Sequence, residues 1–205
     1  MTDPEETPSL RERKKLEKLA SIRAAARELF ATHGYEKTTT RAISERAGIG
    51  AGTLFSYFPD KQSLLVHLFV TEIGAAAAAA VARAESRDAP LLERLMGAFT
   101  DLYAYYARDE ALSRVVVQQM LFLAPGNQRA HEGMSLGFVA RLARLVDDAG
   151  RRGELPPDTP GMLVATAAFA QYFFVLISWL GASLKPTARD AVLRQLLERV
   201  VPTDA

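Results

Sequence analysis

The 205-residue sequence has no cysteine, a single tryptophan and only three histidines. Without thiols it can form no disulfide, thiolate metal site or cysteine nucleophile, and it suits a reducing compartment. His33, His67 and His131 lack metal-ligand spacing, and no Ser-His-Asp order or glycine-rich phosphate loop occurs. We therefore predict no catalytic residue, no metal site and no cofactor. Because a basic-then-apolar signal peptide is also missing, we expect a cytoplasmic protein.

Neither sign of charge dominates the chain, since 25 lysines and arginines stand against 24 aspartates and glutamates. The distribution is nevertheless uneven. Residues 1–8 hold three acids and no base, residues 9–61 hold eleven bases and six acids, and the remainder is nearly neutral. A basic segment of this kind indicates contact with a nucleic acid or an anionic membrane, although a solvated helix face gives the same pattern.

Strand-like alternation is missing as well, because apolar residues recur at steps of three and four. This periodicity predicts an all-α fold with about nine helices. Residues 1–9 contain two prolines and are expected to form a disordered acidic tail. The helices are expected at about 10–33, 40–47, 51–58, 61 through the alanine run at 75–80, 91–107, 112–123, 134–146, 161–183 and 187–200.

The stretch 161–184 contains no charged residue, and three interpretations of it remain open. It is long enough for a transmembrane helix, but it includes polar residues such as Gln171, and no other segment is equally apolar. It also suits a central core helix, or a helix whose second face packs on another subunit. We favour the subunit contact, shared with the last helix, and expect it to involve Tyr172, Phe173, Phe174, Trp179, Leu193, Leu196 and Leu197.

Residues 39–58 have the spacing of a helix–turn–helix, with two short helices on either side of a tight turn at Gly48. Apolar residues are placed to form the small core between the helices: Ile43, Ala47, Ile49, Leu54 and Phe58. The second helix turns small, hydroxyl and aromatic side chains outward instead of lysine and glutamate. Such a surface suits a helix that lies close to another surface, such as a DNA major groove.

Five stretches in this region, at 28–35 (ELFATHGY), 39–43 (TTRAI), 45–49 (ERAGI), 52–58 (GTLFSYF) and 61–65 (KQSLL), resemble the DNA-binding domain of the TetR-type transcriptional regulators. The resemblance covers about a quarter of the chain, and several spacings agree at once. It implies a three-helix DNA-binding domain at 10–60 and a helical ligand-binding and dimerisation domain at 61–205. It also implies a homodimer on a palindromic operator of double-stranded DNA, and no membrane partner.

The resemblance further implies a set of DNA-binding residues: Thr40, Arg41, Ala51, Gly52, Thr53, Phe55, Ser56, Tyr57 and Lys61. Thr40, Thr53, Tyr57 and Lys61 would bond phosphates, whereas Ser56 and Arg41 would reach base edges. Phe55 departs from the common pattern, which has tyrosine there, and Gly50 and Ala51 replace a capping serine and a long polar side chain. Specificity is therefore expected to depend on Arg41, on thymine methyl groups and on DNA shape.

The resemblance also implies a small-molecule effector, whose identity does not follow from the sequence. Aromatic, methionine and amide side chains on the middle helices suit an apolar or aromatic ligand, although such a stripe also suits a core. The candidates are Phe99, Tyr103, Tyr106, Gln118, Gln119, Phe122, Met134 and Phe138. We expect a ligand-responsive repressor. A membrane-attached helical protein, an all-α enzyme and an activator of the same family remain the alternatives.

Overall fold

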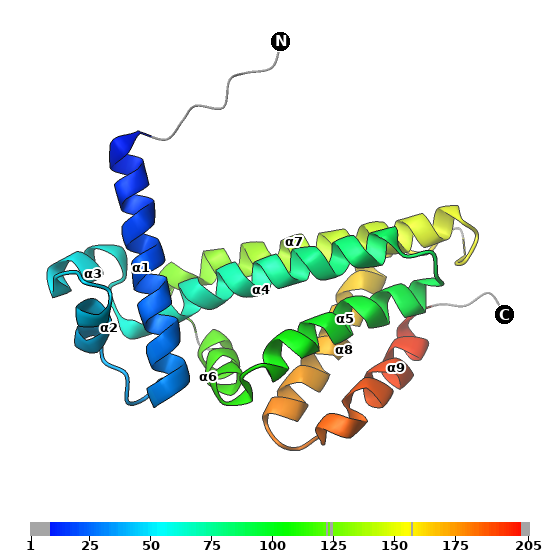
Figure 1. The fold of residues 1–205 in the computed structure, drawn as a ribbon. Helices are drawn as coiled ribbons and strands as arrows, with labels where there is room; N and C mark the ends of the chain where they lie inside the picture. The colour runs from blue at the N-terminus through cyan, green and yellow to red at the C-terminus, as the bar shows by residue number, and fades with distance from the viewer. Residues whose placement is uncertain (1–8, 122, 124, 157, 202–205) are drawn as a thin grey trace, which may run out of the picture. The chain divides into compact units, whose positions relative to one another are not determined.

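The structure is a computed structural model that describes residues 9–121, 123, 125–156 and 158–201. Within these residues it contains nine α-helices, one short 3₁₀ helix and no strand (Figure 1). The predicted all-α class is therefore confirmed, with a helix–turn–helix region followed by a helical body. Residues 1–8 of the predicted acidic tail lie outside the described residues. The chain divides into two compact units, Met1–Leu68 and Phe69–Ala205.

Local capping residues define the helices of the N-terminal unit. Ser9 caps α1 (Leu10–His33) through a capping box, in which its hydroxyl accepts from the Glu12 amide and the Glu12 carboxylate accepts from the Ser9 amide. Gly34 ends this helix with φ +76°, a conformation that favours glycine. The Thr39 hydroxyl then caps α2 (Thr40–Arg46) by accepting from the Ala42 amide at 3.1 Å.

The turn between α2 and α3 (Ala51–Tyr57) contains Gly48 at φ +68°, as the sequence predicted. Ile43, Leu54 and Phe58 are buried between the helices, whereas Ala47 and Ile49 are only half-buried. Asp60 accepts from the Ser63 amide at 2.6 Å and so caps α4 (Lys61–Ser86). The alanine run at 75–80 continues that helix without a break, because alanine has the highest helix propensity.

The boundary between the two compact units lies after Leu68, inside α4, eight residues beyond the expected domain boundary at residue 60. The first two turns of α4 belong to the N-terminal unit because their apolar side chains complete its core. Leu64, Leu65 and Leu68 are each almost fully buried. One continuous helix therefore supplies residues to both units.

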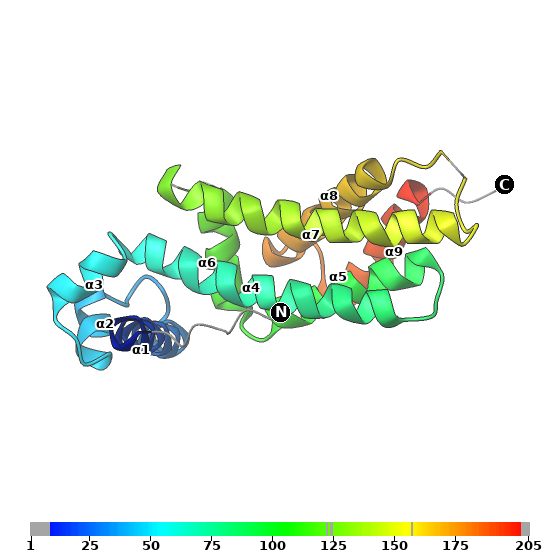
Figure 2. The ribbon, with the colours of Figure 1, turned by 90° about the horizontal axis from the view of Figure 1, so that it is seen from above.

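Helices form the entire C-terminal unit in its described residues (Figures 1 and 2). After the remainder of α4 come α5 (Leu91–Ala107), α6 (Glu110–Leu121), α7 (Pro125–Arg151), α8 (Gly161–Leu180), the 3₁₀ helix η1 (Pro186–Ala188) and α9 (Arg189–Val200). The sequence placed a break at Pro125 and the start of the next helix at 134, whereas Pro125 is the first residue of α7. Proline is well tolerated there because the first helical amide needs no intrahelical acceptor.

Ion pairs and hydrogen bonds tie these helices together. Arg141 of α7 pairs with Glu85 of α4 at 2.6 Å and donates to the Ala78 carbonyl oxygen, so α7 and α4 run side by side. Arg94 of α5 is buried and donates to the Ala84 carbonyl oxygen and to Asp148. A buried guanidinium needs such partners, because leaving it unpaired would be costly.

Gly161, the first residue of α8, lies close to α7. A β-carbon at this position would overlap the side-chain carboxylate of Asp147 and lie 3.2 Å from the carbonyl oxygen of Ala143. A larger residue would therefore require the Asp147 side chain to turn away and a small adjustment at Ala143. Farther along α8, Tyr172 stacks on Phe99 of α5 with ring centroids 4.8 Å apart.

Two helices, α4 and α8, are long and apolar enough to cross a membrane by length and composition. The expectation that no other segment is as apolar as 161–184 was therefore wrong, because the mean hydropathy of the best window is 1.9 in α4 and 1.8 in α8. Core helices of globular proteins meet the same criterion. About half of the apolar window of each, 50% in α4 and 44% in α8, is buried against the rest of the chain. Packing within the fold thus accounts for much of their apolar character.

Candidate DNA-binding surface and ligand cavity

The outer face of α3 carries small and aromatic side chains with no charge. Ala51, Gly52 and Ser56 are exposed, Phe55 is 51% exposed, and the predicted contact residues Thr53 and Tyr57 are half-buried. The Ser56 hydroxyl donates back to the Thr53 carbonyl oxygen at 2.7 Å. The helix can therefore approach another surface closely at Ala51, Gly52 and Ser56, whose side chains are small.

The start of α2 presents Thr40 and Arg41 beside this face. Thr40 is half-buried, and the Arg41 side chain is exposed, with its Nε 2.8 Å from Oε1 of Glu45. The hydrogen bond from Arg41 to the Glu45 carboxylate raises the pKa of the guanidinium further. An exposed ion pair of this type contributes little to stability, so Arg41 can exchange Glu45 for another hydrogen-bond acceptor.

Lys61, which the family resemblance assigned to a phosphate, has protein partners in this structure. Its Nζ donates to the Tyr35 carbonyl oxygen at 2.8 Å and to the Glu36 carbonyl oxygen at 3.4 Å. The same ammonium group lies 4.1 Å from the centre of the Tyr35 ring. Lys61 thus joins the start of α4 to the segment after α1, and its phosphate contact remains a prediction.

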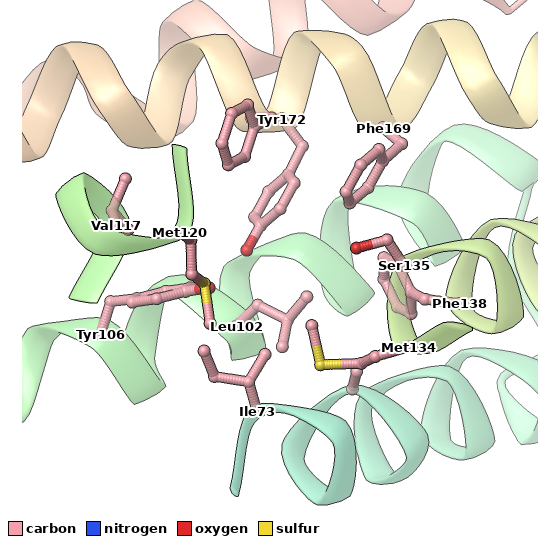
Figure 3. A pocket seen from close by; sticks show the side chains of 12 residues that line it. Ile73, Leu102, Tyr106, Val117, Met120, Met134, Ser135, Phe138, Phe169 and Tyr172 are labelled. Carbon is pink, nitrogen blue, oxygen red and sulfur yellow. The ribbon is translucent and has the colours of Figure 1, made fainter. Parts of the chain in front are cut away.

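An apolar cavity lies in the C-terminal unit, between five helices (Figure 3). Each helix contributes two or three side chains, which are Ile73 and Ala77 of α4, Leu102 and Tyr106 of α5, Val117 and Met120 of α6, Met134, Ser135 and Phe138 of α7, and Phe169, Tyr172 and Phe173 of α8. Its volume of about 40 Å³ is room for about three water molecules.

A groove of about 290 Å³ adjoins this cavity between α4 and α7. The groove and the cavity share Ala77, Met134 and Phe138. Three glycines, Gly74, Gly133 and Gly137, keep the groove wide, and Arg141 lies on its wall. A narrow apolar cavity and an open groove that carries a cation therefore share part of their walls.

Hydroxyl groups are the polar side-chain groups of the cavity wall, and none of the described lining residues is charged. A hydrogen bond joins the hydroxyl groups of Tyr106 and Tyr172. Burial raises the pKa of Tyr106 to about 12 and holds the pKa of Tyr172 well above its usual range, so both are neutral. The third hydroxyl belongs to Ser135. Such a wall favours a neutral, apolar part of a ligand.

The structure places some of the predicted ligand residues in the cavity wall and others outside it. Tyr106, Met134 and Phe138 line the cavity. Phe99 and Tyr103 instead lie behind it, fully buried against Tyr172, because the core needs their rings to fill the space between α5 and α8. Gln118 is exposed and Gln119 is half-buried, outside the lining. Phe122 lies outside the described residues.

Several cavity residues were missed by the sequence reasoning. Ile73 and Ala77 belong to α4, and Phe169, Tyr172 and Phe173 belong to α8, two helices that were given other roles. Their apolar periodicity was visible, but periodicity identifies an inward face without identifying what that face encloses.

The predicted dimer residues also differ in their placement. Tyr172, Trp179, Leu193 and Leu197 are buried inside the protomer, because α8 and α9 pack on α5 and on each other. Phe173 lines the cavity and Leu196 is half-buried. Phe174 is 55% exposed, and the same helix exposes Met162 and Leu163 by 56% and 66%. The outer face of α8 therefore carries exposed apolar residues, of which Phe174 was predicted and Met162 and Leu163 were not.

Comparison with known proteins places the N-terminal region in a family. Residues 22–68 match the model of bacterial regulatory proteins of the tetR family. The fatty acid metabolism regulator protein of Bacillus subtilis (strain 168) is 34% identical over 62 residues, which is 30% of this chain and 32% of that protein. The chain thus matches about a third of the length of this relative.

A longer match covers both units. The transcriptional repressor KstR of Rhodococcus jostii (strain RHA1) is 26% identical over 171 residues, 80% of this chain and 73% of that protein. The crystal structure of the transcriptional regulator FadR from Bacillus subtilis in complex with stearoyl-CoA shares the fold, with a TM-score of 0.69 and 21% identity over 89% of this chain and 97% of that chain. The helix–turn–helix unit therefore matches bacterial regulatory proteins of the tetR family over residues 22–68, and the fold of the whole chain is similar to that of a solved transcriptional regulator.

Proposed function

We propose that this protein is a ligand-responsive repressor that binds a palindromic operator as a homodimer. The observation that carries the proposal is the uncharged, small-residue face of α3, held by a helix–turn–helix core within the family match. A recognition helix of this shape fits a major groove. Thr40, Thr53 and Tyr57 would bond phosphates, and Arg41 would reach a base edge after it leaves Glu45.

The homodimer is supported by the outer face of α8. Met162, Leu163 and Phe174 are large apolar residues that one protomer leaves exposed. Exposed apolar residues gathered on one helix mark a protein interface more often than an ordinary surface. A two-fold contact through this face would present two copies of α3, and this symmetry requires an operator with matching half-sites.

For the effector, we propose a long-chain acyl-CoA. The FadR structure from Bacillus subtilis contains stearoyl-CoA, and the uncharged cavity of this chain suits an acyl chain. The groove between α4 and α7 would hold the polar remainder of the ligand, with the Arg141 guanidinium available to an anionic group once Glu85 is displaced.

Release from DNA would follow from the small size of the cavity. At about 40 Å³ it is far below the usual 300–1,000 Å³ of a small-molecule site, so an acyl chain must push lining residues apart. Ile73 and Ala77 are on α4, the helix whose first turns belong to the N-terminal unit. A shift of α4 would alter how the recognition helices are held and would favour the unbound state.

The proposal is tested by selecting DNA from a random library with the purified full chain, then adding stearoyl-CoA to the selected complex. We expect a palindromic consensus and release of the DNA by stearoyl-CoA, with free CoA as the matched control. Failure to select any consensus would remove the DNA-binding function. Release by CoA and stearoyl-CoA at equal concentrations would remove the acyl-chain role of the cavity.

A further inference from the structure

The first three turns of α1 extend beyond the part of the chain that matches the family. The helix begins at Leu10, whereas the match begins at residue 22. These twelve helical residues span roughly 18 Å at the rise of an α-helix. They carry five bases against two acids, the bases being Arg11, Arg13, Lys14, Lys15 and Lys18. This segment is therefore the most basic part of the described helix.

Four of these bases gather on one face of the helix. Arg11, Lys14, Lys15 and Lys18 follow the spacing i, i+3, i+4, i+7, which places side chains on one side of an α-helix. The structure shows the result, because all four line one cleft with Ser56 and Tyr57 of α3. Both walls of the cleft belong to the N-terminal unit, so this arrangement is fixed within that unit.

Cations outnumber carboxylates in and around this cleft. No acidic residue is among the described residues that line it. The two acids of the segment are Glu12 and Glu17, each adjacent in sequence to one of the four bases. Glu12 is hydrogen-bonded to the amide and hydroxyl of Ser9 in the capping box, and these bonds, with the charge of Lys15, lower the pKa of its carboxyl. The cleft therefore retains an excess of positive charge that suits a polyanion.

We propose that the basic face of α1, formed by Arg11, Lys14, Lys15 and Lys18, is a second DNA contact that binds phosphates of the strand bordering the groove entered by α3. This inference rests on the proposed operator binding. The position of Ser56 and Tyr57 in the same cleft selects DNA as the partner, because a phosphate near the end of a bound α3 lies within reach of the cleft. From Arg11 to Lys18 the helix rises roughly 10 Å, which equals the rise of about three phosphates of one strand along the duplex axis, at 3.4 Å each.

A salt titration tests the proposal directly. The double variant Lys14→Gln/Lys18→Gln removes two cations per protomer from exposed positions and leaves the capping box in place. We expect the plot of log affinity for the selected operator against log salt, between about 50 and 200 mM, to become shallower by roughly 3 to 4, since each lost phosphate contact changes the slope by about 0.9 and the dimer loses four. The loss should be nearly equal for the best operator and for single-base variants of it.

The matched control is Lys185→Gln/Arg151→Gln, which removes the same charge from exposed positions of the C-terminal unit. We expect its salt slope to equal that of the wild type. Equal slopes for all three proteins would overturn the proposal while leaving operator binding intact. If the wild type itself selects no operator, the proposed function fails instead.

An anionic membrane is the competing partner for a basic helix that also exposes Leu10 and Leu16. Binding of the protein to vesicles with and without phosphatidylserine tests whether an anionic membrane is the partner. Vesicle binding that the wild type shows and Lys14→Gln/Lys18→Gln loses, with an unchanged DNA salt slope, would overturn the DNA contact. Hydroxyl-radical footprints should show the supporting result, with backbone positions beside the α3 site protected by the wild type and exposed with the variant.

Discussion

Nη2 of Arg23, on α1, lies 2.7 Å from the ring nitrogen Nε2 of His67, on α4. A guanidinium can only donate, so His67 accepts through Nε2 and is neutral in this contact. Burial lowers the pKa of His67, and the charge of Arg23 lowers it further. The His67 ring also packs on Phe58, with centroids 5.1 Å apart. This one side chain therefore links three segments of the N-terminal unit.

Acid should weaken the N-terminal unit through His67. Because the folded pKa lies below the usual 6.5, unfolding takes up a proton, and stability falls as the pH drops below about 6.5. We expect the urea midpoint, followed by circular dichroism, to fall between about pH 7.5 and pH 5.5, and to fall less in His67→Gln, whose amide oxygen accepts without titrating. His33→Gln is the control and should keep the full pH dependence. An unchanged dependence in His67→Gln would contradict this role.

Alkaline pH should unfold the C-terminal unit before its buried tyrosines ionise. Burial raises the pKa of Tyr103, Tyr106 and Tyr172, that of Tyr106 to about 12. A tyrosine whose pKa is higher in the folded than in the unfolded protein makes its full contribution to folding stability below the unfolded pKa of 10.0. That contribution is lost as the pH rises above 10.0 toward the folded pKa. Phenolate absorbance should therefore show a group of tyrosines whose ionisation appears together with loss of helix. Ionisation of all six tyrosines in one early step would contradict their burial.

A methyl group in the groove should impair the effector. A β-carbon at Gly137 meets no protein atom within 4 Å, so Gly137→Ala narrows the groove without a clash. We expect stearoyl-CoA binding to weaken, because the methyl group occupies space that the polar part of the ligand needs. Gly150→Ala is the matched control on the same helix, also without a neighbour within 4 Å. Both changes should stabilise α7 by about 1 kcal/mol, so equal ligand binding in the two variants would remove the groove from the ligand path.

The outer face of α8 should control assembly. Leu163→Gln places an amide on that face, whereas Leu136→Gln makes the same change at a residue of α7 with similar exposure, 70% against 66%. Sedimentation equilibrium should show a weakened dimer for Leu163→Gln and an unchanged one for Leu136→Gln. Two unchanged dimers would mean that another surface forms the contact.

Two substitutions test the DNA contacts of the helix–turn–helix. Arg41→Ala should weaken operator binding by about 1–3 kcal/mol and relax specificity at one base position, because the proposed role of its guanidinium is to contact a base edge.

Tyr57→Phe removes one hydroxyl group and should weaken binding by about 1 kcal/mol at every DNA sequence alike, as expected for a neutral hydrogen bond to a phosphate. Gel shifts measure both, and sedimentation checks that the dimer persists. Unchanged affinity in both variants would refute these roles.

The helix ends of the N-terminal unit could be predicted closely because they depend on local chemistry. Gly34, Thr39 and Gly48 act through caps and turns that involve residues only a few positions away. Lys61 shows where local reasoning ends. Its partner Tyr35 is 26 positions away, so neither the resemblance nor the spacing could show that its ammonium group was already bonded.

The cavity was less predictable because it depends on how five helices meet. Phe99 and Phe138 look alike in the sequence, yet Phe99 fills the core and Phe138 faces the cavity. On α8, Tyr172 and Phe174 are two residues apart and lie on different sides of the helix, one buried and one exposed. An all-apolar helix gives no signal that separates such faces.

The contact at Gly161 has a consequence for how such a protein can change over time. It brings the start of α8 close to α7, where a β-carbon would lie 3.2 Å from the Ala143 carbonyl oxygen. Farther along the same helix, Tyr172 lines the cavity and Phe174 is exposed on another side. Under the proposed function, substitutions on the exposed side would change the choice of partner subunit without touching the cavity wall. Two duplicated copies of the gene would then be able to pair selectively while keeping a common effector.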